Sequence, residues 1–438
     1  MYRIAMISVH SCPLAALGGK ETGGMNVYIR ELSRELAKKG LQIDIFTRSQ
    51  NPAIPQIVNF HKGVRIIHLK AGPESPYDKN QVWFHLPEFL NSMQRFSREE
   101  KISYNLIHSH YWLSGWVGVK LSTRWKIPLL HMFHTLGYFK NKVIKPLGKR
   151  EPALRLQTEQ QLVEYADHIT VPSHREKVQM IWTCGAPSEK ISVIPCGVDP
   201  DLFAPLDPSQ SKTHLALSCK RFILFVGRID PVKGIDTLLK SMTIVRNKLS
   251  HSQDSNLLII GGDIDYSSYS KDSEMHKLKL LTTELGLENM VTFLGPQRQD
   301  QLPYFYSAAE ACVLPSRYES FGMVALEAMA CGTPVIASKV GGLTSFIQDE
   351  LTGFLVPEEN EEALAEKILV LLDNSTLKGK LGFQARIRAV ELSWQNIANK
   401  MISLYQSLLE EKIESETKRT SFYASLQDGN RVTLATQQ

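Results

Sequence analysis

The sequence lacks several features that would identify whole classes of protein. Its 438 residues contain only six cysteines, at positions 12, 184, 196, 219, 312 and 331. None of them belongs to a CxxC pair, so nothing indicates a disulfide framework or a structural zinc site. The apolar runs are far shorter than the roughly 18 residues that span a membrane, and no signal-peptide pattern opens the chain. We therefore expect a reduced, cytoplasmic protein without an integral membrane segment.

A strong excess of one charge is also absent. Lys and Arg number 50 against 45 Asp and Glu, which gives a net charge of +5. So small an excess does not by itself predict a nucleic-acid partner. Apolar residues make up 43% of the chain and charged residues 22%, a balance typical of a packed domain rather than a disordered chain. The length allows two or three domains.

Strand-like apolar runs alternate with amphipathic helical segments, which predicts an α/β fold with parallel sheets and crossover helices. The runs form two series, separated by the polar, proline-containing stretch 199–220. We expect two doubly wound Rossmann-like domains, residues 1–200 and 201–393, that face each other across a cleft. Residues 394–413 are expected to form a helix packed back on the first domain, and residues 414–438 a loosely ordered tail.

The loop after the predicted strand Phe222–Val226 carries two cations. Arg228 and Lys233 are five residues apart, between Gly227 and Gly234. Ligands of open parallel sheets bind beyond the carboxyl ends of the strands, so these two side chains could bracket a diphosphate. For an isolated pair, two solvated surface cations are the simpler interpretation.

A second loop carries Glu319, with Glu327 eight residues later. A helix is expected to begin near Gly322, where free backbone amides can bind a phosphate and the missing side chain lets a ligand approach. Glu327 would lie in an apolar helix, where a carboxylate needs a partner such as ribose hydroxyls. Glu319 could accept hydrogen bonds from sugar hydroxyls. The alternative is one capping acid and one satisfied core glutamate, and we favour the ligand site.

The first half of the chain gives weaker signals. Its glycine-rich loop, residues 18–26, matches neither the P-loop nor the G-x-G-x-x-G pattern. Asp44 lies about 20 residues after Gly24, as in dinucleotide sites, but without the fingerprint. Residues 140–155 hold six cations against Glu151 alone. Such a stretch would attract an acceptor phosphate or a lipid surface, or it is a solvated loop.

Two apparent metal signals do not support a metal site. Asp263 and Asp265 form a D-x-D match of a kind that is common by chance in polar loops. Four histidines cluster at predicted strand ends without a matching set of carboxylates, so hydrogen-bonded core histidines are the better interpretation. These histidines are His108, His110, His131 and His134.

Together these segments resemble the retaining, nucleotide-sugar-dependent glycosyltransferases of the glycogen-synthase-like group, glycosyltransferase family 4, which have the GT-B fold. The resemblance covers about residues 1–410, and the Glu319–Glu327 and Gly227–Gly234 segments are its most specific parts. It implies that Arg228 and Lys233 bind the donor diphosphate in place of a metal ion. It also implies that the catalytic set includes His134 and Glu319, and that further donor contacts come from Gly24, Phe293, Phe321, Gly322, Met323 and Glu327.

Within that family, the first half of the chain is most similar to the inositol-phosphate N-acetylglucosaminyltransferases of mycothiol synthesis. The likeness rests on segments 23–28, 108–112 and 134–141. Sucrose-phosphate synthases are the second choice, because they usually carry Gln in place of Met25 and Ser in place of Thr135. These likenesses imply acceptor contacts at Asn26, Lys79, Tyr111, Thr135, Lys140 and Arg155.

We therefore expect a metal-independent enzyme that moves a sugar from a UDP-sugar to a hydroxyl of a phosphorylated small acceptor resembling inositol phosphate. It should need no cofactor and bind no nucleic acid. Whether it forms a homodimer is left open by the sequence. Four alternatives remain at this point: sucrose-phosphate synthesis, a UDP-sugar 2-epimerase, a dehydrogenase, and transfer to a lipid acceptor at a membrane surface.

Overall fold

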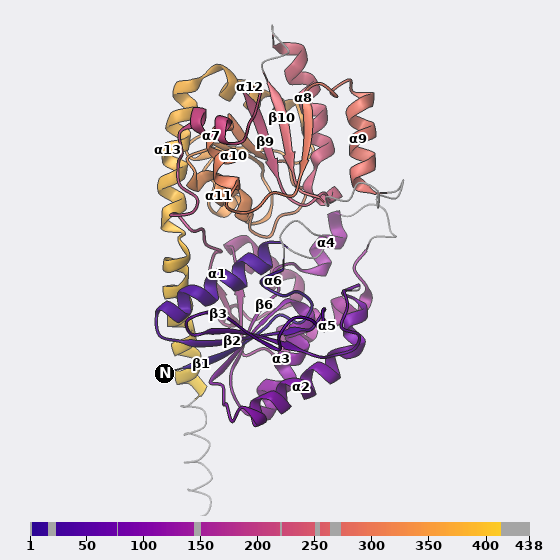
Figure 1. Cartoon of the computed structure of the whole chain (residues 1–438), viewed down its shortest axis with the longest axis vertical. Helices are drawn as coiled ribbons and strands as arrows, with labels where there is room; N and C mark the ends of the chain where they lie inside the picture. The colour runs from indigo at the N-terminus through magenta and orange to yellow at the C-terminus, as the bar shows by residue number, and fades with distance from the viewer. Residues whose placement is uncertain are drawn as a thin grey trace, which may run out of the picture.

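Two parallel sheets, one in each half of the chain, form the core of the protein (Figure 1). The structure is a computed structural model that describes residues 2–15, 23–76, 78–143, 150–219, 221–249, 255–262 and 273–412. Most of the glycine-rich loop, Lys145, Lys149, Asp263, Asp265 and the tail lie outside these residues. The α/β fold with two doubly wound sheets is confirmed.

The first sheet has eight strands in the order β3-β4-β2-β1-β5-β6-β7-β8, and only the β3–β4 pair is antiparallel. Ile4 of the central strand β1 pairs with Ile43 on one side and with Leu106 on the other. The strands are β1 Arg3–Ile7, β2 Gln42–Arg48, β3 Ile57–His61, β4 Val64–Leu69, β5 Leu106–His110, β6 Leu129–Met132, β7 His168–Val171 and β8 Ile191–Val193. The edge strand β3 was not predicted, because it is short and only half-buried.

Helices cover both faces of this sheet. Helix α1 (Gly24–Lys38) buries Tyr28, Ile29 and Leu32 along one face, and Gly40 follows it with φ of 94°, a left-handed conformation that suits glycine. The remaining helices are η1 Gln81–His85, α2 Leu86–Glu99, α3 Tyr111–Trp125, α4 Gly137–Val143, α5 Ala153–Tyr165, α6 His174–Cys184 and η3 Ser188–Lys190.

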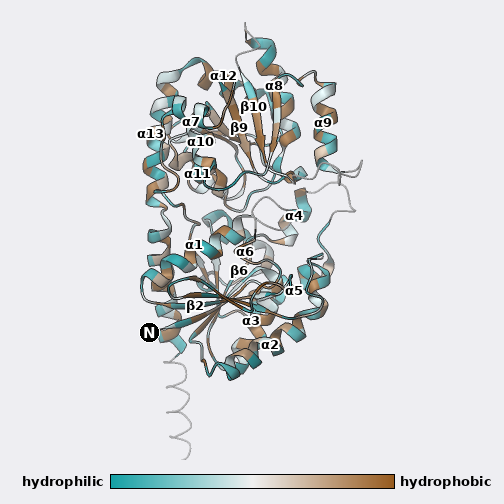
Figure 2. Cartoon of the chain, in the orientation of Figure 1, coloured by the Kyte–Doolittle hydropathy of each residue, from teal (hydrophilic) through white to brown (hydrophobic). Residues whose placement is uncertain are grey.

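The second sheet has six parallel strands in the order β11-β10-β9-β12-β13-β14. These are β9 Phe222–Val226, β10 Asn256–Ile260, β11 Val291–Gly295, β12 Ala311–Leu314, β13 Val335–Ser338 and β14 Gly353–Val356. The helices are α7 Pro208–His214, η4 Pro231–Lys233, α8 Ile235–Lys248, α9 Glu274–Glu284, α10 Leu302–Ala308, α11 Met323–Ala330, η6 Gly341–Ser345, α12 Glu361–Asp373 and α13 Ser375–Glu391. Figure 2 shows β9 and β10 as apolar, as strands covered on both faces must be.

A last helix, residues 394–412, continues from α13 and runs along the first half of the chain (Figure 1). The Trp394 ring packs edge-on against Tyr28 of α1, at 5.5 Å between centroids. The Tyr405 hydroxyl and His108 Nδ1 are 2.8 Å apart. The chain therefore passes from the first half to the second and then returns. After its return, the last helix packs against the first half through Trp394 and Tyr405. No helix in the described part is long and apolar enough to cross a membrane.

Candidate active site

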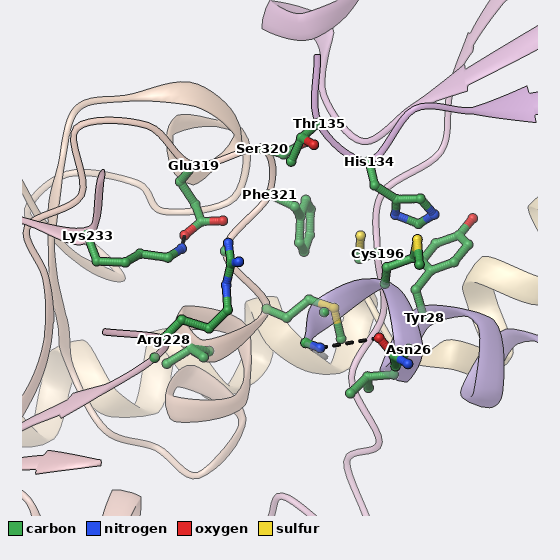
Figure 3. Close-up of a pocket in the computed structure, with 18 of the residues that line it drawn as sticks. Asn26, Tyr28, His134, Thr135, Cys196, Arg228, Lys233, Glu319, Ser320 and Phe321 are labelled. Carbon is green, nitrogen blue, oxygen red and sulfur yellow. Dashed lines mark hydrogen bonds and ion pairs between the residues drawn. The ribbon is translucent and has the colours of Figure 1, made fainter. Parts of the chain in front are cut away.

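A cavity of about 350 Å³ lies between the two halves, where loops at the carboxyl ends of both sheets meet. Figure 3 shows side chains from both halves that point into it. Fifteen residues proposed from the sequence lie on its wall: Gly24, Asn26, Lys79, Tyr111, His134, Thr135, Lys140, Arg155, Arg228, Lys233, Glu319, Phe321, Gly322, Met323 and Glu327. Segments separated by up to 300 residues are thus brought to one place.

Phe293 is the proposed donor residue that does not line this cavity, and its contact with the donor stays a prediction. It belongs to β11 and packs, partly buried, against the apolar core of the second half. Side chains alternate along a strand, and this one points toward the core rather than toward the cavity. Pro296 and Gln297, just past the end of the same strand, line the cavity instead.

Arg228 and Lys233 flank the turn that follows β9. The Lys233 ammonium forms an ion pair with the Glu319 carboxylate, and both side chains are largely buried. Arg228 has no hydrogen bond or ion pair with any other described residue, and its side chain approaches Gly23 from across the cavity. The turn is tightly packed, because a Cβ added at Gly234 would lie 2.0 Å from the carbonyl oxygen of Pro315. The wall that the second half contributes thus presents one paired cation, Lys233, and one unpaired cation, Arg228.

Helix α11 begins at the same cavity. Gly322 precedes it with φ of 98°, and a Cβ at that position would lie 2.4 Å from Leu343. Only glycine fits this close, left-handed turn without displacement. The Met323 Sδ atom approaches to 3.4 Å of a Cβ placed on Gly24, so the helix start faces α1 across the cavity. Its unpaired backbone amides add a partial positive charge to that of the two cations.

Glu327 lies one turn further along α11 and is 7% exposed. One of its oxygens, Oε2, accepts a hydrogen bond of 3.0 Å from the Tyr306 hydroxyl. Burial raises the pKa of Glu327 to about 7, and the Tyr306 hydrogen bond offsets only part of that rise. The carboxylate also lines the cavity, where a ligand with hydroxyl donors would stabilise its charged form.

His134 stands on the opposite wall in a left-handed backbone conformation, with φ of 59°. Its Nε2 lies 3.0 Å from Nδ1 of His110, and its ring meets the Tyr28 ring edge-on at 5.3 Å. Burial lowers the pKa of His134 to about 3, so the imidazole is neutral near pH 7. A neutral ring can position a ligand hydroxyl or carbonyl, but it brings no charge.

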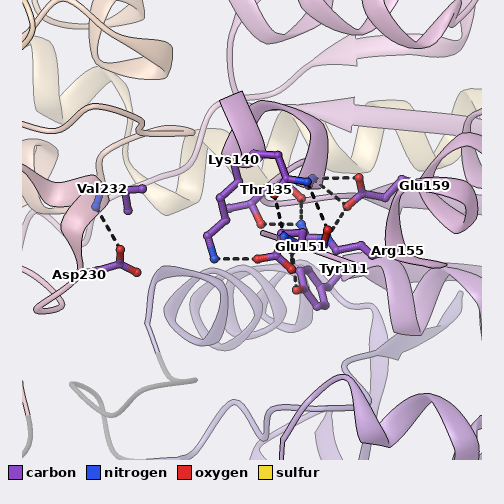
Figure 4. Close-up of polar contacts among 10 residues, drawn as sticks. Tyr111, Thr135, Lys140, Glu151, Arg155, Glu159, Asp230 and Val232 are labelled. Carbon is purple, nitrogen blue, oxygen red and sulfur yellow. Dashed lines mark hydrogen bonds and ion pairs between the residues drawn. The ribbon is translucent and has the colours of Figure 1, made fainter. Parts of the chain in front are cut away.

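Arg155 is the hub of the first half's side of the cavity (Figure 4). It is 1% exposed and pairs with Glu151 at 2.9 Å and with Glu159 at 2.7 Å. It also donates to the Tyr111 hydroxyl (2.9 Å) and to the Thr135 carbonyl (2.7 Å). The counted excess of cations in residues 140–155 is therefore partly neutralised inside the fold.

Lys140 and Lys79 complete this wall. The Lys140 ammonium lies 2.7 Å from Glu151 Oε1. Burial alone raises the pKa of Glu151, but Arg155 and Lys140 outweigh it and lower that pKa to about 2. The Lys79 ammonium has no hydrogen bond or ion pair among the described residues, yet its charge helps to lower the pKa of His10 after the larger effect of burial. On this wall Lys140 and Arg155 are thus already paired with Glu151, whereas the Lys79 ammonium has no such partner among the described residues.

Asn26 and Asp44 both make hydrogen bonds inside the fold, and the acceptor contact proposed for Asn26 stays a prediction. Asn26 is 1% exposed and its amide donates to Ser11 Oγ (2.8 Å) and to the Cys12 carbonyl (2.7 Å), so it holds the loop before α1 in place. Asp44 forms two hydrogen bonds of 2.8 Å with Arg65 and lines no part of the cavity. This ion pair removes the remaining support for a dinucleotide site.

Contacts between the two halves were missed from the sequence, among them the following three. Ser320 Oγ donates to Glu176 Oε2 at 2.9 Å, Tyr318 packs against the core of the first half, and Arg30 donates to Gln299. Glu176 stands three residues after Ser173, whose hydroxyl caps α6. That S-x-x-E spacing predicts a helix cap. The sequence therefore explains Glu176 by a local role and does not indicate its contact with Ser320.

Comparison with known proteins assigns this geometry to a family. The family model described as glycosyltransferase family 4 matches residues 22–202, and the one described as glycosyl transferases group 1 matches residues 208–388. D-inositol 3-phosphate glycosyltransferase from Corynebacterium glutamicum is 37% identical over 422 residues, which cover 95% of this chain and 99% of that protein. The chain belongs to the family 4, group 1 glycosyltransferases.

Solved structures agree with this assignment. Sucrose-phosphate synthase from Thermosynechococcus elongatus superposes with a TM-score of 0.86 at 36% identity, over 94% of this chain and all of that one. Anabaena HepE in complex with UDP-glucose has the same fold, with a TM-score of 0.72 at 18% identity over 93% of this chain and all of that one. The GT-B fold and the identification as a hexosyltransferase are thereby confirmed, which disfavours the epimerase and dehydrogenase alternatives.

Proposed function

We propose that this glycosyltransferase transfers a sugar from a UDP-sugar to a hydroxyl of a phosphorylated polyol resembling inositol phosphate, with retention of anomeric configuration and without a metal ion. One observation carries the proposal. The cavity joins two anion-binding walls, one from each half of the chain: Arg228, Lys233 and the start of α11 on one side, and Lys79 with the Arg155 hub on the other. A reaction between two phosphate-bearing substrates needs such a pair.

The donor fits the second half. Arg228 and Lys233 would hold the two phosphates, one as a planar fork and the other as a point charge. Glu327 would accept hydrogen bonds from the ribose hydroxyls, and Pro296 and Gln297 stand where the base would lie. Glu319 would exchange its present partner, Lys233, for hydroxyls of the donor sugar once the diphosphate binds the lysine.

The acceptor fits the first half, where Lys79 is the cation free to meet a phosphate. Arg155 keeps Tyr111 and Thr135 aligned beside it. D-Inositol 3-phosphate glycosyltransferases recur among the relatives, at 34–38% identity. Their names support a polyol phosphate as the acceptor.

The chemistry follows from where charge develops. The bond between the anomeric carbon and the diphosphate oxygen breaks, the sugar becomes oxocarbenium-like, and negative charge grows on the leaving group. Arg228, Lys233 and the amides of α11 stabilise that charge. The acceptor oxygen then bonds to the same face, and its proton passes to the leaving phosphate oxygen. Neutral His134 would position the sugar and take no proton.

The test is a panel of UDP- and GDP-sugars offered to inositol phosphate, fructose 6-phosphate and a lipid acceptor in EDTA, with products weighed by mass spectrometry. Transfer to inositol phosphate supports the proposal. Transfer to fructose 6-phosphate alone would favour the second candidate, sucrose-phosphate synthesis. The 36% identity to the solved sucrose-phosphate synthase supports this candidate. Free sugar epimer without an acceptor would refute both. A cytoplasmic location and a homodimer stay predictions.

A further inference from the structure

The segment that carries Glu319 contacts both halves of the chain with successive residues. Arg317 forms two hydrogen bonds with Asp236 of α8, at 2.9 and 2.7 Å, and Glu319 pairs with Lys233. Both of these partners belong to the second half. The side chains between and after them, Tyr318 and Ser320, reach the first half instead.

Ser320 makes the clearest contact across the interface. Its hydroxyl donates to Glu176 Oε2 at 2.9 Å, and Glu176 is only 6% exposed. Glu176 stands in the first turn of α6, where the neighbouring Arg175 also reaches the carbonyl of Lys339 at 3.4 Å. Burial raises the pKa of Glu176 to about 7, and the Ser320 hydrogen bond works against that rise. A buried carboxylate needs such a donor.

Tyr318 joins the same segment to the acceptor wall. Its ring packs against the core of the first half, and its hydroxyl lies beside the backbone of Leu136. Leu136 directly follows Thr135, whose carbonyl and hydroxyl are both held by Arg155. The loop on the donor side is thus linked, through one residue, to the wall proposed for the acceptor.

On its own side the segment has no room to withdraw. The Gly342 amide donates to the Glu319 carbonyl at 3.0 Å. A Cβ on Gly341 would lie 1.6 Å from that same carbonyl oxygen. The backbone of Glu319 therefore packs directly against η6 on one side. On the other side, Tyr318 and Ser320 contact the first half.

We propose that Glu176 is a positioning residue, which acts through Ser320 to hold Glu319 toward the donor sugar when the two halves are closed. The proposal rests on the proposed function and goes beyond it. Glu319 engages the sugar only while the Ser320–Glu176 contact is made, so the donor is activated only when the acceptor wall is in place. This coupling limits loss of the activated sugar to water.

The test compares Ser320→Ala and Glu176→Gln with Ser320→Thr, which keeps the hydroxyl. Ser241→Ala is the matched control, because the Ser241 hydroxyl is a buried donor to the Thr237 carbonyl within α8 of the second half. In the first two variants we expect kcat to fall about tenfold or more, from the loss of one charge-assisted hydrogen bond. The ratio of sugar hydrolysis to sugar transfer should rise, while the dissociation constant of UDP stays within about twofold. Ser320→Thr should restore the wild-type ratio.

A second measurement needs no acceptor and so separates this proposal from the proposed function. Small-angle scattering with UDP alone reports the closure of the two halves, and we expect Ser320→Ala and Glu176→Gln to compact less than wild type. Wild-type kcat, hydrolysis ratio and compaction in both variants would overturn the proposal, as would an equal loss in Ser241→Ala. If the wild type closes on UDP but transfers sugar to no acceptor in the panel, the proposed function fails while the closure result still stands. If one variant fails to fold, which its thermal unfolding would show, the other decides.

Discussion

Replacing Lys233 with alanine is the sharpest perturbation of the donor site. The side chain contributes one positive charge to the cavity wall, and its ammonium pairs with Glu319 in the free protein. Removing it takes away a fixed donor for the leaving diphosphate. It also leaves the Glu319 carboxylate without its partner beside the site where negative charge develops. Both effects raise the barrier to bond cleavage.

The magnitude follows from the burial of the pair. Two unit charges about 4 Å apart interact by roughly 4 kcal/mol at an effective dielectric constant of about 20, which suits a site near the protein surface. The Lys233 and Glu319 side chains are 17% and 16% exposed, so solvent screens this interaction only in part. Part of this electrostatic stabilisation is already present in the free protein, where Lys233 pairs with Glu319. We therefore expect a loss of about 3 kcal/mol, or on the order of 100-fold in kcat.

The assay is steady-state transfer with the purified protein, beside Lys240→Ala as the matched control. Lys240 is a half-exposed lysine of α8 that also pairs with a glutamate, Glu361, at 3.3 Å. Surface pairs of this kind contribute little, so the control should keep wild-type turnover. A Lys233→Ala protein with kcat within about twofold of wild type would refute the assigned role, as would an equal loss in the control.

Three further outcomes are expected. Because the pKa of Glu327 is about 7 and ribose hydroxyls favour its charged form, UDP-glucose should bind about tenfold more weakly at pH 6 than at pH 8, by calorimetry. The Glu327→Gln variant should bind UDP-glucose more weakly at both pH values and lose the dependence of affinity on pH. A pH dependence retained in this variant would contradict the role assigned to Glu327. Lys79→Ala should raise the KM for a phosphorylated acceptor about tenfold and spare UDP binding, whereas Lys70→Ala, at a 70% exposed side chain, should change neither. Trp394→Ala should lower the free energy of unfolding in urea by about 3–5 kcal/mol, since the ring is 3% exposed and fills space beside Tyr28; a loss below about 1 kcal/mol would show that the last helix is not part of the core.

Much of the fold could be predicted from the sequence, because buried parallel strands are continuous apolar runs separated by helical periodicity. The predicted strand Phe222–Val226, for example, has the same bounds as β9. The edge strand β3 was not predicted because its side chains are only partly buried, so it lacks such a run. The side-chain direction of Phe293 could not be predicted for a related reason, because it depends on the register of the strand.

The candidate site was predictable where a residue's chemistry contradicts its surroundings. Glu327, an acid in an apolar helix, is of this kind. Arg155 was named for a cationic role, yet its charge is balanced by Glu159, four residues along the same helix, and by Glu151. Glu176 gave no signal, because its helix-cap position explained it locally. Contacts that join residues more than 140 apart, as Ser320 and Glu176 do, exist only once the two halves are packed.

The central claim is that the diphosphate of the donor rests between Arg228 and Lys233. A crystal structure with UDP, grown in EDTA, tests it most directly. The account predicts both phosphorus atoms beside the Arg228 guanidinium and the Lys233 ammonium, with Glu319 released from the lysine. Phosphorus atoms bound elsewhere in the cavity, or UDP that binds only when a divalent ion is restored, would contradict it.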